Sequence, residues 1–212
     1  MTLALAPALA RLPLLAILRG LRPDAAREVG EALLACGLTA LEVPLNRPEA
    51  LRSIEHLATA CGERAAIGAG TVLNVRQVRA VRDAGGSFVV APDTNADVIE
   101  AALDACLTPL PGFGTPTEAF RALAAGARHL KLVPAGTFGP EYLGALRAVL
   151  PAEAAVLAVG GIDARAMSGW LAAGAAGFGL GTALYTPELD RSEIAARATR
   201  LVDAYEAART GR

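Results

Sequence analysis

Short runs of aliphatic residues alternate along the chain with stretches in which apolar residues recur at helical spacing. The runs are rich in branched side chains, which is typical of buried strands. They number eight and occupy 14–19, 40–45, 65–70, 88–92, 107–111, 129–133, 155–159 and 177–181. Between them, sets such as Val29, Leu33 and Cys36 place apolar side chains on one face of a helix. The pattern predicts repeated strand–helix units.

Prolines and glycines stand where the ends of the expected helices lie. Proline is tolerated in the first helical turn, because its missing N–H has no partner there, and it occupies positions 23, 48, 116 and 140. Glycine readily adopts the left-handed turn that closes a helix, and it occupies positions 37, 62, 85, 126 and 174. Thr115 and Glu118 have the spacing of a capping box.

Eight such units, each of roughly 20–26 residues, match a compact (β/α)8 barrel, the TIM barrel of the α/β class. We expect a single domain over residues 1–212, because no proline- or serine-rich linker and no block of charge interrupts the pattern. An open doubly wound sheet is the alternative. Its glycine fingerprint is absent after the first strand, where residues 19–23 are RGLRP.

The composition excludes several classes of protein. A chain that is 53% hydrophobic and 19% charged has the side chains of a large core, which excludes disorder. A net charge of −1 and 4% aromatic residues offer neither a basic field nor a stacking platform, so we expect no nucleic-acid partner. The uncharged run 166–187 holds five glycines, which indicates several short elements and no membrane helix.

The cysteines and the N-terminal residues bear on the cellular compartment. Cys36, Cys61 and Cys106 lie far apart without a CxxC pair, so we expect neither a disulfide framework nor a zinc site. The apolar stretch in residues 1–20 contains proline, and no basic residue precedes it, which makes a signal peptide a poor match. These features favour the reducing cytoplasm as the compartment in which we expect the protein.

The chain has 20 lysine and arginine residues, and only Lys131 is a lysine. It stands in the apolar strand HLKLVP, where an ammonium group must be desolvated, paired or lowered in pKa. Only an amine that loses its proton attacks a carbonyl, and a guanidinium does not. The alternative is a lysine that extends to solvent or pairs with a neighbour. Its uniqueness favours a Schiff base at Lys131.

Glu42 lies on the second predicted strand, four strands from Lys131 in a ring of eight. The two side chains would therefore face one another across the barrel mouth. An iminium acidifies the adjacent carbon, and cleavage there needs a group that moves protons. Glu42 suits that role as a catalytic residue, and the alternative is an internal ion pair with Lys131.

Further candidates stand at the carboxyl ends of other strands, where barrels bind substrate. Gly160 and Gly161 end the seventh strand, and Gly181 and Thr182 end the eighth, where backbone N–H groups commonly bind phosphate. Arg19 ends the first strand and suits paired hydrogen bonds to phosphate or carboxylate, or a salt bridge at the rim.

Thr71 follows the third strand and offers a hydroxyl and an N–H to a carboxylate, or caps the next helix together with Asn74. His129 shares the side-chain direction of Lys131 one layer deeper, which indicates a hydrogen-bonded interior residue, and His56 is expected to face solvent. No cluster has the spacing of metal ligands, so we expect neither a metal nor another cofactor.

Six segments together carry a resemblance to a known family. They occur in order and read LPLLAILRG at 12–20, EVPLN at 42–46, IGAGTV at 67–72, PG at 111–112, LKLVP at 130–134 and AVGG at 158–161. Over residues 12–205 the chain resembles the class I 2-keto-3-deoxy-6-phosphogluconate and phosphogalactonate aldolases. The resemblance implies a pyruvate-dependent aldolase with Lys131 as the imine-forming residue and Glu42 as proton donor and acceptor. The implied substrate contacts are Arg19, Thr71, Lys131, Gly160, Gly161, Gly181 and Thr182.

Two positions indicate the branch of the family. The phosphogluconate branch usually reads EVTLR on the second strand, with the arginine on the substrate carboxylate, whereas this chain has Pro44 and Asn46. The resemblance therefore implies reversible cleavage of 2-keto-3-deoxy-6-phosphogalactonate to pyruvate and D-glyceraldehyde 3-phosphate, in sugar-acid catabolism. Thr182 stands where relatives often have serine, and residues 134–140 also depart from them. The family's use of trimers implies a homotrimer.

Three alternatives to this function stay open from the sequence. The first is the same chemistry on 2-keto-3-deoxy-6-phosphogluconate or 4-hydroxy-2-oxoglutarate. The second is a phosphosugar isomerase or epimerase that uses the carboxylate without an imine. The third is a non-catalytic barrel that binds a phosphorylated metabolite and has no need of Lys131.

Overall fold

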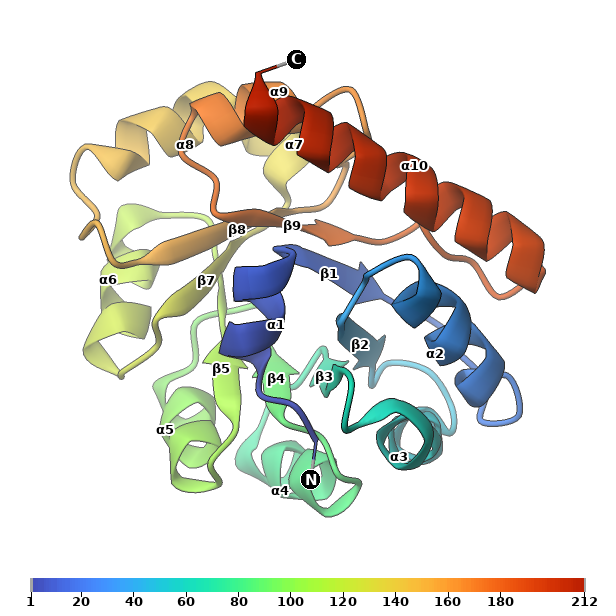
Figure 1. The fold of residues 1–212 in the computed structure, drawn as a ribbon. Coiled ribbons are helices and arrows are strands. Elements are labelled where there is room, and N and C mark those ends of the chain that lie inside the picture. Colours follow the sequence, from blue (N-terminus) through green and yellow to red (C-terminus); the bar gives the residue numbers. More distant parts are fainter. Residues whose placement is uncertain (1, 212) are drawn as a thin grey trace.

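The computed structural model describes residues 2–211, and the strands in this range form one parallel sheet (Figure 1). The strands are β1 (Leu14–Ile17), β2 (Ala40–Pro44), β3 (Ala66–Gly70), β4 (Phe88–Val90), β5 (Thr108–Leu110), β6 (Gly112–Phe113), β7 (His129–Leu132), β8 (Ala155–Val159) and β9 (Gly177–Leu180). Their order in the sheet is β5-β4-β3-β2-β1-β9-β8-β7-β6. The two end strands, β5 and β6, are separated in the chain only by Pro111, so the sheet closes into a barrel.

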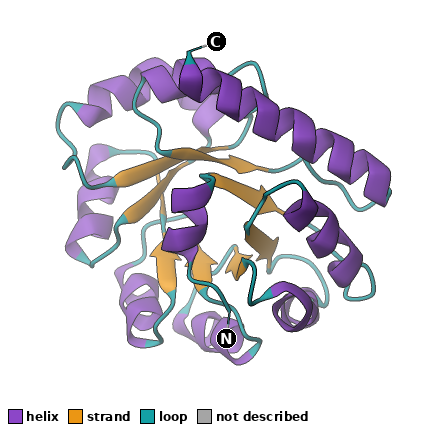
Figure 2. Ribbon diagram, viewed as in Figure 1, coloured by secondary structure: helices purple, strands orange, loops and turns teal. Residues whose placement is uncertain are grey.

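Helices cover this barrel on the outside and at one end (Figure 2). They are α1 (Leu5–Arg11), α2 (Ala26–Ala35), α3 (Ala50–Cys61), α4 (Val75–Asp83), α5 (Ala96–Asp104), α6 (Pro116–Ala124), α7 (Ala135–Phe138), α8 (Pro140–Arg147), α9 (Met167–Ala172) and α10 (Arg191–Thr210). Parallel strands that alternate with helices around a closed sheet confirm the predicted (β/α)8 barrel.

Every predicted strand is present, but the fifth differs from its expected form. It divides into β5 and β6 because Pro111 has no N–H to donate to a neighbouring strand. β5 pairs with β4, and β6 pairs with β7. The carbonyl of Pro111 accepts a hydrogen bond of 2.9 Å from the N–H of Lys131, which keeps β7 in register at the break.

Most of the predicted helix ends are also present. Thr115 and Glu118 form the expected capping box of α6, with Pro116 at its first position. Of the five glycines expected in left-handed turns, Gly62 is the exception, since its φ of −57° is right-handed. The other four have positive φ.

The interior of the barrel is layered, because alternate strand residues point inward. The layer toward the amino ends of the strands is apolar and includes Leu15, Phe88 and Leu157. Leu5 and Leu9 of α1 pack against this layer, so α1 covers that end of the barrel (Figure 1). The sequence pattern did not predict α1. The buried charged residues on the inward side of the strands, Glu42 and Lys131, lie toward the carboxyl end of the barrel.

The apolar segments that raised the question of membrane insertion are parts of this fold. The uncharged run 166–187 contains α9 and β9 as separate elements, and the N-terminal stretch forms α1 and β1. Among residues 2–211 no helix has both the length and the apolar character needed to cross a bilayer.

Candidate active site

One cavity at the carboxyl ends of the strands contains every candidate site residue. Its volume is about 280 Å³, close to the lower end of the range for small-molecule sites, roughly 300 Å³. The eight candidates that line it are Arg19, Glu42, Thr71, Lys131, Gly160, Gly161, Gly181 and Thr182. They come from six strands or the residues directly after them, so the closure of the barrel brings them together.

Glu42 points into the barrel because it shares the inward direction of Ala40, two residues earlier on β2. Its side chain is buried, with 3% of its surface exposed, and its Oε2 atom has no hydrogen-bond partner within residues 2–211. Burial raises the pKa of Glu42, and the positive charges of Lys131 and Arg19 oppose that shift only in part. The protonated carboxyl is therefore favoured more than in water.

Lys131 lies on β7 with 8% of its surface exposed, so its side chain does not extend into solvent. Burial lowers the pKa of the amine, Glu42 opposes this shift, and Arg19 adds to it. Among residues 2–211 neither Lys131 nor Glu42 takes part in an ion pair within 4.0 Å. The cavity therefore contains an amine and a carboxyl that are both shifted toward their neutral forms and are not paired.

Such a pair of groups can carry out imine chemistry. A neutral amine is the nucleophile that adds to a ketone, and a carboxyl with a raised pKa is more often protonated as a donor and is a stronger base once it is ionised. Since both groups line the same small cavity, one bound substrate can reach both. The structure thus agrees with the sequence argument about the positions of Lys131 and Glu42.

Gly70, the last residue of β3, makes room for the Glu42 carboxyl group. β2 and β3 are paired in parallel, and a Cβ atom added at Gly70 would overlap Oε1 of Glu42 and lie 2.6 Å from its carboxyl carbon. Any side chain at this position would therefore displace the carboxyl group from its present place.

We expect Gly70→Ala to lower kcat for the imine chemistry of Lys131 and Glu42 by about 10²-fold or more, because the displaced Glu42 carboxyl no longer reaches the reacting atoms. Gly144→Ala, inside α8, is a matched control, since an added Cβ there meets nothing within 4 Å. The control should keep its kcat and gain about 0.5–1 kcal/mol of stability. Steady-state kinetics and urea unfolding measure both effects. An unchanged kcat in Gly70→Ala would contradict the assigned role of Gly70.

Thr71 occupies a strained backbone conformation at the cavity. Its φ of 57° is left-handed, a region in which a β-branched residue is rare. Asn74 caps α4 through a hydrogen bond that its side chain accepts from the N–H of Gln77. Thr71 makes no contribution to that cap and instead lines the cavity. The strain is consistent with a functional position for Thr71.

Arg19 follows β1 at the mouth of the cavity, and its side chain is exposed. Its guanidinium donates a hydrogen bond of 2.8 Å to the side-chain oxygen of Asn46. No carboxylate among residues 2–211 forms an ion pair with it, so the rim salt bridge considered as an alternative is absent from this range. The remaining donors of Arg19 are free for an anionic ligand.

The glycine loops after β8 and β9 present backbone donors to the cavity. Gly160 and Gly161 both have positive φ, 97° and 77°, which other residues rarely adopt. Among residues 2–211, the N–H groups of Gly161, Thr182 and Ala183 have no hydrogen-bond acceptor. Unpaired N–H groups at a cavity suit an anion such as phosphate.

The cavity wall also contains residues that the sequence did not identify as candidates. They are Ile17, Val133, Val159, Ile162, Gly179, Ala183 and Tyr185. The aliphatic members at strand ends could have been found from their inward direction, which they share with the polar candidates. Tyr185 lies beyond β9 in a loop, and no local pattern indicates that its ring is buried at the cavity.

The histidines lie apart from this cavity. His129, at the start of β7, is half-buried, and burial lowers its pKa. Its ring makes no hydrogen bond within residues 2–211, which corrects the expectation of a hydrogen-bonded residue. His56 is exposed as expected, and its Nδ1 lies 2.8 Å from the carbonyl oxygen of Pro23. No group of three or more metal-ligating side chains is present in the described range.

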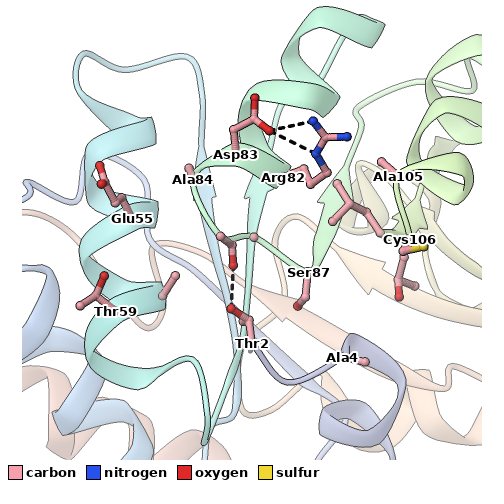
Figure 3. A pocket seen from close by; sticks show the side chains of 15 residues that line it. Thr2, Ala4, Glu55, Thr59, Arg82, Asp83, Ala84, Ser87, Ala105 and Cys106 are labelled. Atoms are coloured by element: carbon pink, nitrogen blue, oxygen red, sulfur yellow. Dashed lines mark hydrogen bonds and ion pairs between the residues drawn. The ribbon is translucent and has the colours of Figure 1, made fainter.

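A larger hollow, of about 720 Å³, lies at the opposite end of the barrel beside the amino ends of β4 and β5. Figure 3 shows Thr2 bound to the carbonyl of Gly85 and an ion pair between the adjacent Arg82 and Asp83 in its wall. Neither Arg82 nor Asp83 is buried, and the exposed Cys106 completes the wall. The hollow thus lacks the buried, pKa-shifted groups that distinguish the cavity around Lys131.

The fold and the cavity are those of an aldolase-type barrel, and comparison with known proteins supports this class. The family model described as KDPG and KHG aldolase matches residues 6–201. The 2-dehydro-3-deoxy-6-phosphogalactonate aldolase of Escherichia coli (strain K12) is 44% identical over 198 residues, which are 93% of this chain and 97% of that protein. The chain belongs to the KDPG and KHG aldolase family.

Two further comparisons agree with this assignment. A probable 2-dehydro-3-deoxy-6-phosphogalactonate aldolase of Rhizobium meliloti (strain 1021) is 43% identical over 92% of each chain. A solved structure described as native KDPGal superposes with a TM-score of 0.93 at 42% identity, covering 99% of this chain and 100% of that one. The fold predicted from the sequence and the family resemblance are both confirmed.

Proposed function

We propose that this protein is an imine-forming aldolase that reversibly cleaves 2-keto-3-deoxy-6-phosphogalactonate into pyruvate and D-glyceraldehyde 3-phosphate. The observation that carries the proposal is that one cavity contains a buried Lys131 amine without an ion-pair partner and a buried Glu42 carboxyl. The relatives with 44% and 43% identity bear the name of the phosphogalactonate enzyme, which favours that substrate.

The reaction begins when the Lys131 amine adds to the C2 ketone of the substrate. The Glu42 carboxyl donates a proton to the hydroxyl of the adduct, which leaves as water, and the resulting iminium ion withdraws electrons from the neighbouring C3–C4 bond. The lowered pKa of Lys131 favours this step, because only the neutral amine has a lone pair to donate. An arginine at this position would remain protonated.

Glu42 then moves the protons of the cleavage step. Its carboxylate accepts the proton of the C4 hydroxyl, and the C3–C4 bond breaks. The electron pair of that bond moves onto the iminium and converts it into a neutral enamine. The C4 to C6 fragment leaves as D-glyceraldehyde 3-phosphate. The Glu42 carboxyl returns its proton to C3, and water hydrolyses the new iminium to pyruvate and the free amine, while the proton released by this hydrolysis returns to the Glu42 carboxylate. No atom or charge is left over.

The other cavity residues bind the two anionic ends of the substrate in this proposal. Arg19 and Thr71, beside β1 and β3, donate to the carboxylate of the pyruvate half. The two glycine loops bind the phosphate, through Gly160–Gly161 and Gly181–Thr182. The unpaired N–H groups of Gly161 and Thr182 support this arrangement, as does the cavity wall that the loops share.

Asn46 supports the galactonate epimer as the substrate. In the phosphogluconate branch an arginine at this position meets the substrate carboxylate, whereas here Asn46 accepts a hydrogen bond from Arg19. The cationic donor near the carboxylate would thus come from β1 in this chain, and not from β2. A different direction of approach to the carboxylate would suit a substrate of different hydroxyl configuration.

Borohydride trapping tests the proposed chemistry. Protein incubated with pyruvate and sodium borohydride should carry a reduced adduct on the peptide that contains Lys131, detected by mass spectrometry. Cleavage rates on 2-keto-3-deoxy-6-phosphogalactonate, its gluconate epimer and 4-hydroxy-2-oxoglutarate should then rank the galactonate first. A folded protein with no adduct would instead support an imine-free isomerase or a barrel that only binds a phosphorylated metabolite.

We propose further that the protein acts in the cytoplasm as a homotrimer within sugar-acid catabolism. The three free cysteines, Cys36, Cys61 and Cys106, suit a reducing compartment. The large apolar side chains of Leu103 on α5 and Phe120 on α6 are 43% and 45% exposed on neighbouring helices, which suits burial by another copy. Sedimentation equilibrium of the purified protein measures the stoichiometry directly.

A further inference from the structure

One hydrogen bond connects the last helix to the backbone of the cavity wall. The guanidinium of Arg197, in the first half of α10, donates to the carbonyl oxygen of Thr182 at 3.2 Å. The helix runs along the outside of the barrel between α9 and α2 (Figure 1). Thr182 and the following Ala183 line the cavity. A charged side chain outside the cavity thus holds a peptide group of its wall.

The geometry of a peptide bond gives this contact a consequence inside the cavity. The peptide between Thr182 and Ala183 is trans, so its C=O and N–H point in opposite directions. The carbonyl is drawn toward Arg197 on α10, and the N–H of Ala183 is therefore turned to the other side. That N–H belongs to a residue of the cavity wall and has no acceptor within residues 2–211.

The other hydrogen bonds of this turn do not involve the polar atoms of this peptide group. The N–H groups of Leu184 and Tyr185 both donate to the carbonyl of Gly181, at 2.8 and 3.0 Å, which closes the turn. Neither bond uses the carbonyl of Thr182 or the N–H of Ala183. Arg197 is the only side chain among residues 2–211 that donates to this carbonyl. Its positive charge also polarises the peptide and makes the N–H a stronger donor.

We propose that Arg197 is a positioning residue for phosphate recognition, because it fixes the Thr182–Ala183 peptide with the Ala183 N–H directed at the substrate phosphate. The inference rests on the proposed function, in which the loop after β9 binds that phosphate. Arg197 touches neither the substrate nor the reacting atoms. Its effect should therefore be confined to the binding of the phosphorylated part of the substrate.

The test compares Arg197→Met with Arg200→Met. Both variants lose one positive charge from α10, but Arg200 is exposed and its side chain makes no hydrogen bond within the described range. Arg197→Met should raise KM for 2-keto-3-deoxy-6-phosphogalactonate by about 3- to 10-fold, the effect of one hydrogen bond, and change kcat less than about twofold. Arg200→Met should match the wild type. Arg197→Lys, which keeps a cationic donor, should restore part of the affinity.

Two controls separate positioning from structural damage. For the unphosphorylated analogue 2-keto-3-deoxygalactonate, kcat/KM should be the same in Arg197→Met and the wild type, because no phosphate meets the Ala183 N–H. Equal losses on both substrates, or equal effects of the Arg197 and Arg200 variants, would overturn the proposal. Thermal unfolding of each variant shows whether the fold is retained.

Binding of inorganic phosphate separates this inference from the proposed function. Calorimetric titration of the wild type with phosphate, with no keto acid present, should show an affinity that Arg197→Met weakens about 3- to 10-fold and Arg200→Met does not. A wild type that binds phosphate in this way but cleaves no keto acid would reject the aldolase and keep the role of Arg197. Unaltered phosphate binding in Arg197→Met would reject the role of Arg197, whether or not the protein cleaves its substrate.

Discussion

Replacing Lys131 by arginine is expected to lower kcat for aldol cleavage by about 10³-fold or more. The variant keeps a positive charge on β7, but a guanidinium neither loses its proton at working pH nor forms an imine. The loss should therefore appear in kcat and in borohydride trapping alike, with no adduct on the peptide that carries position 131. Steady-state kinetics and peptide mass spectrometry measure the two effects.

A second variant controls for folding, since arginine is larger than lysine in a cavity of about 280 Å³. Lys131→Met has a side chain of similar length and no charge to desolvate, so it should be at least as stable as the wild type. It should be as inactive as Lys131→Arg. Retained turnover in a well-folded variant of either kind would reject the imine mechanism. The imine-free isomerase and the barrel that only binds a phosphorylated metabolite would then be the alternatives to test.

Replacing Glu42 by glutamine is expected to lower kcat by about 10²- to 10⁴-fold, the usual contribution of general acid–base catalysis. Glutamine has the shape of the protonated carboxyl but neither accepts nor donates the proton that cleavage requires. Lys131 is intact in this variant, so borohydride should still trap pyruvate on it. A Glu42→Gln protein that turns over at the wild-type rate would show that another group moves the proton.

The same variant has a predicted effect on stability that depends on pH. Burial raises the pKa of Glu42 above the value of 4.5 that applies to the unfolded chain. Above pH 4.5 the unfolded state loses this proton while the folded state retains it, so wild-type stability falls relative to Glu42→Gln up to the raised folded-state pKa. Below pH 4.5 the two proteins carry the same neutral group, and their stabilities should agree.

Urea unfolding at about pH 4 and about pH 8 measures this difference. The unfolding midpoint of Glu42→Gln should match the wild type at the lower pH and exceed it at the higher one. An equal difference at both values would show that folding does not shift the pKa of Glu42, and a less stable variant at about pH 8 alone would show that the folded protein stabilises the Glu42 carboxylate. Either result would contradict the conclusion that burial is the main influence on the pKa of Glu42.

The residues that carry the fold were largely visible in the sequence. Apolar runs with β-branched residues located all the strands, because a buried parallel strand must be apolar on both faces. The exception is the break at Pro111, where the missing N–H of one residue divides a strand that the pattern predicted as continuous. α1 was missed because a short apolar segment has the same local pattern whether it forms a helix or a strand.

The positions of the site residues also followed from the sequence, for a geometric reason. Once the chain forms a closed parallel barrel, the carboxyl ends of all strands meet at one rim, so Glu42 on β2 and Lys131 on β7 must approach the same cavity. The uniqueness of Lys131 among 20 basic residues then distinguished it from a solvent-facing cation. Tyr185 and Arg197 were not found, since each lies in a segment whose local pattern is that of an ordinary loop or helix.

The sequence by itself determined the order of strands and helices, the inward direction of Glu42 and Lys131, and the family. These depend on spacing within a few residues or on motifs along the chain. Only the tertiary structure decided how far each group is desolvated, that Glu42 fits only beside Gly70, that Thr71 adopts a left-handed backbone, and that Arg197 holds the peptide after Thr182. Burial and side-chain contacts depend on segments that are far apart in the chain, and a local sequence pattern does not show which of these segments come into contact.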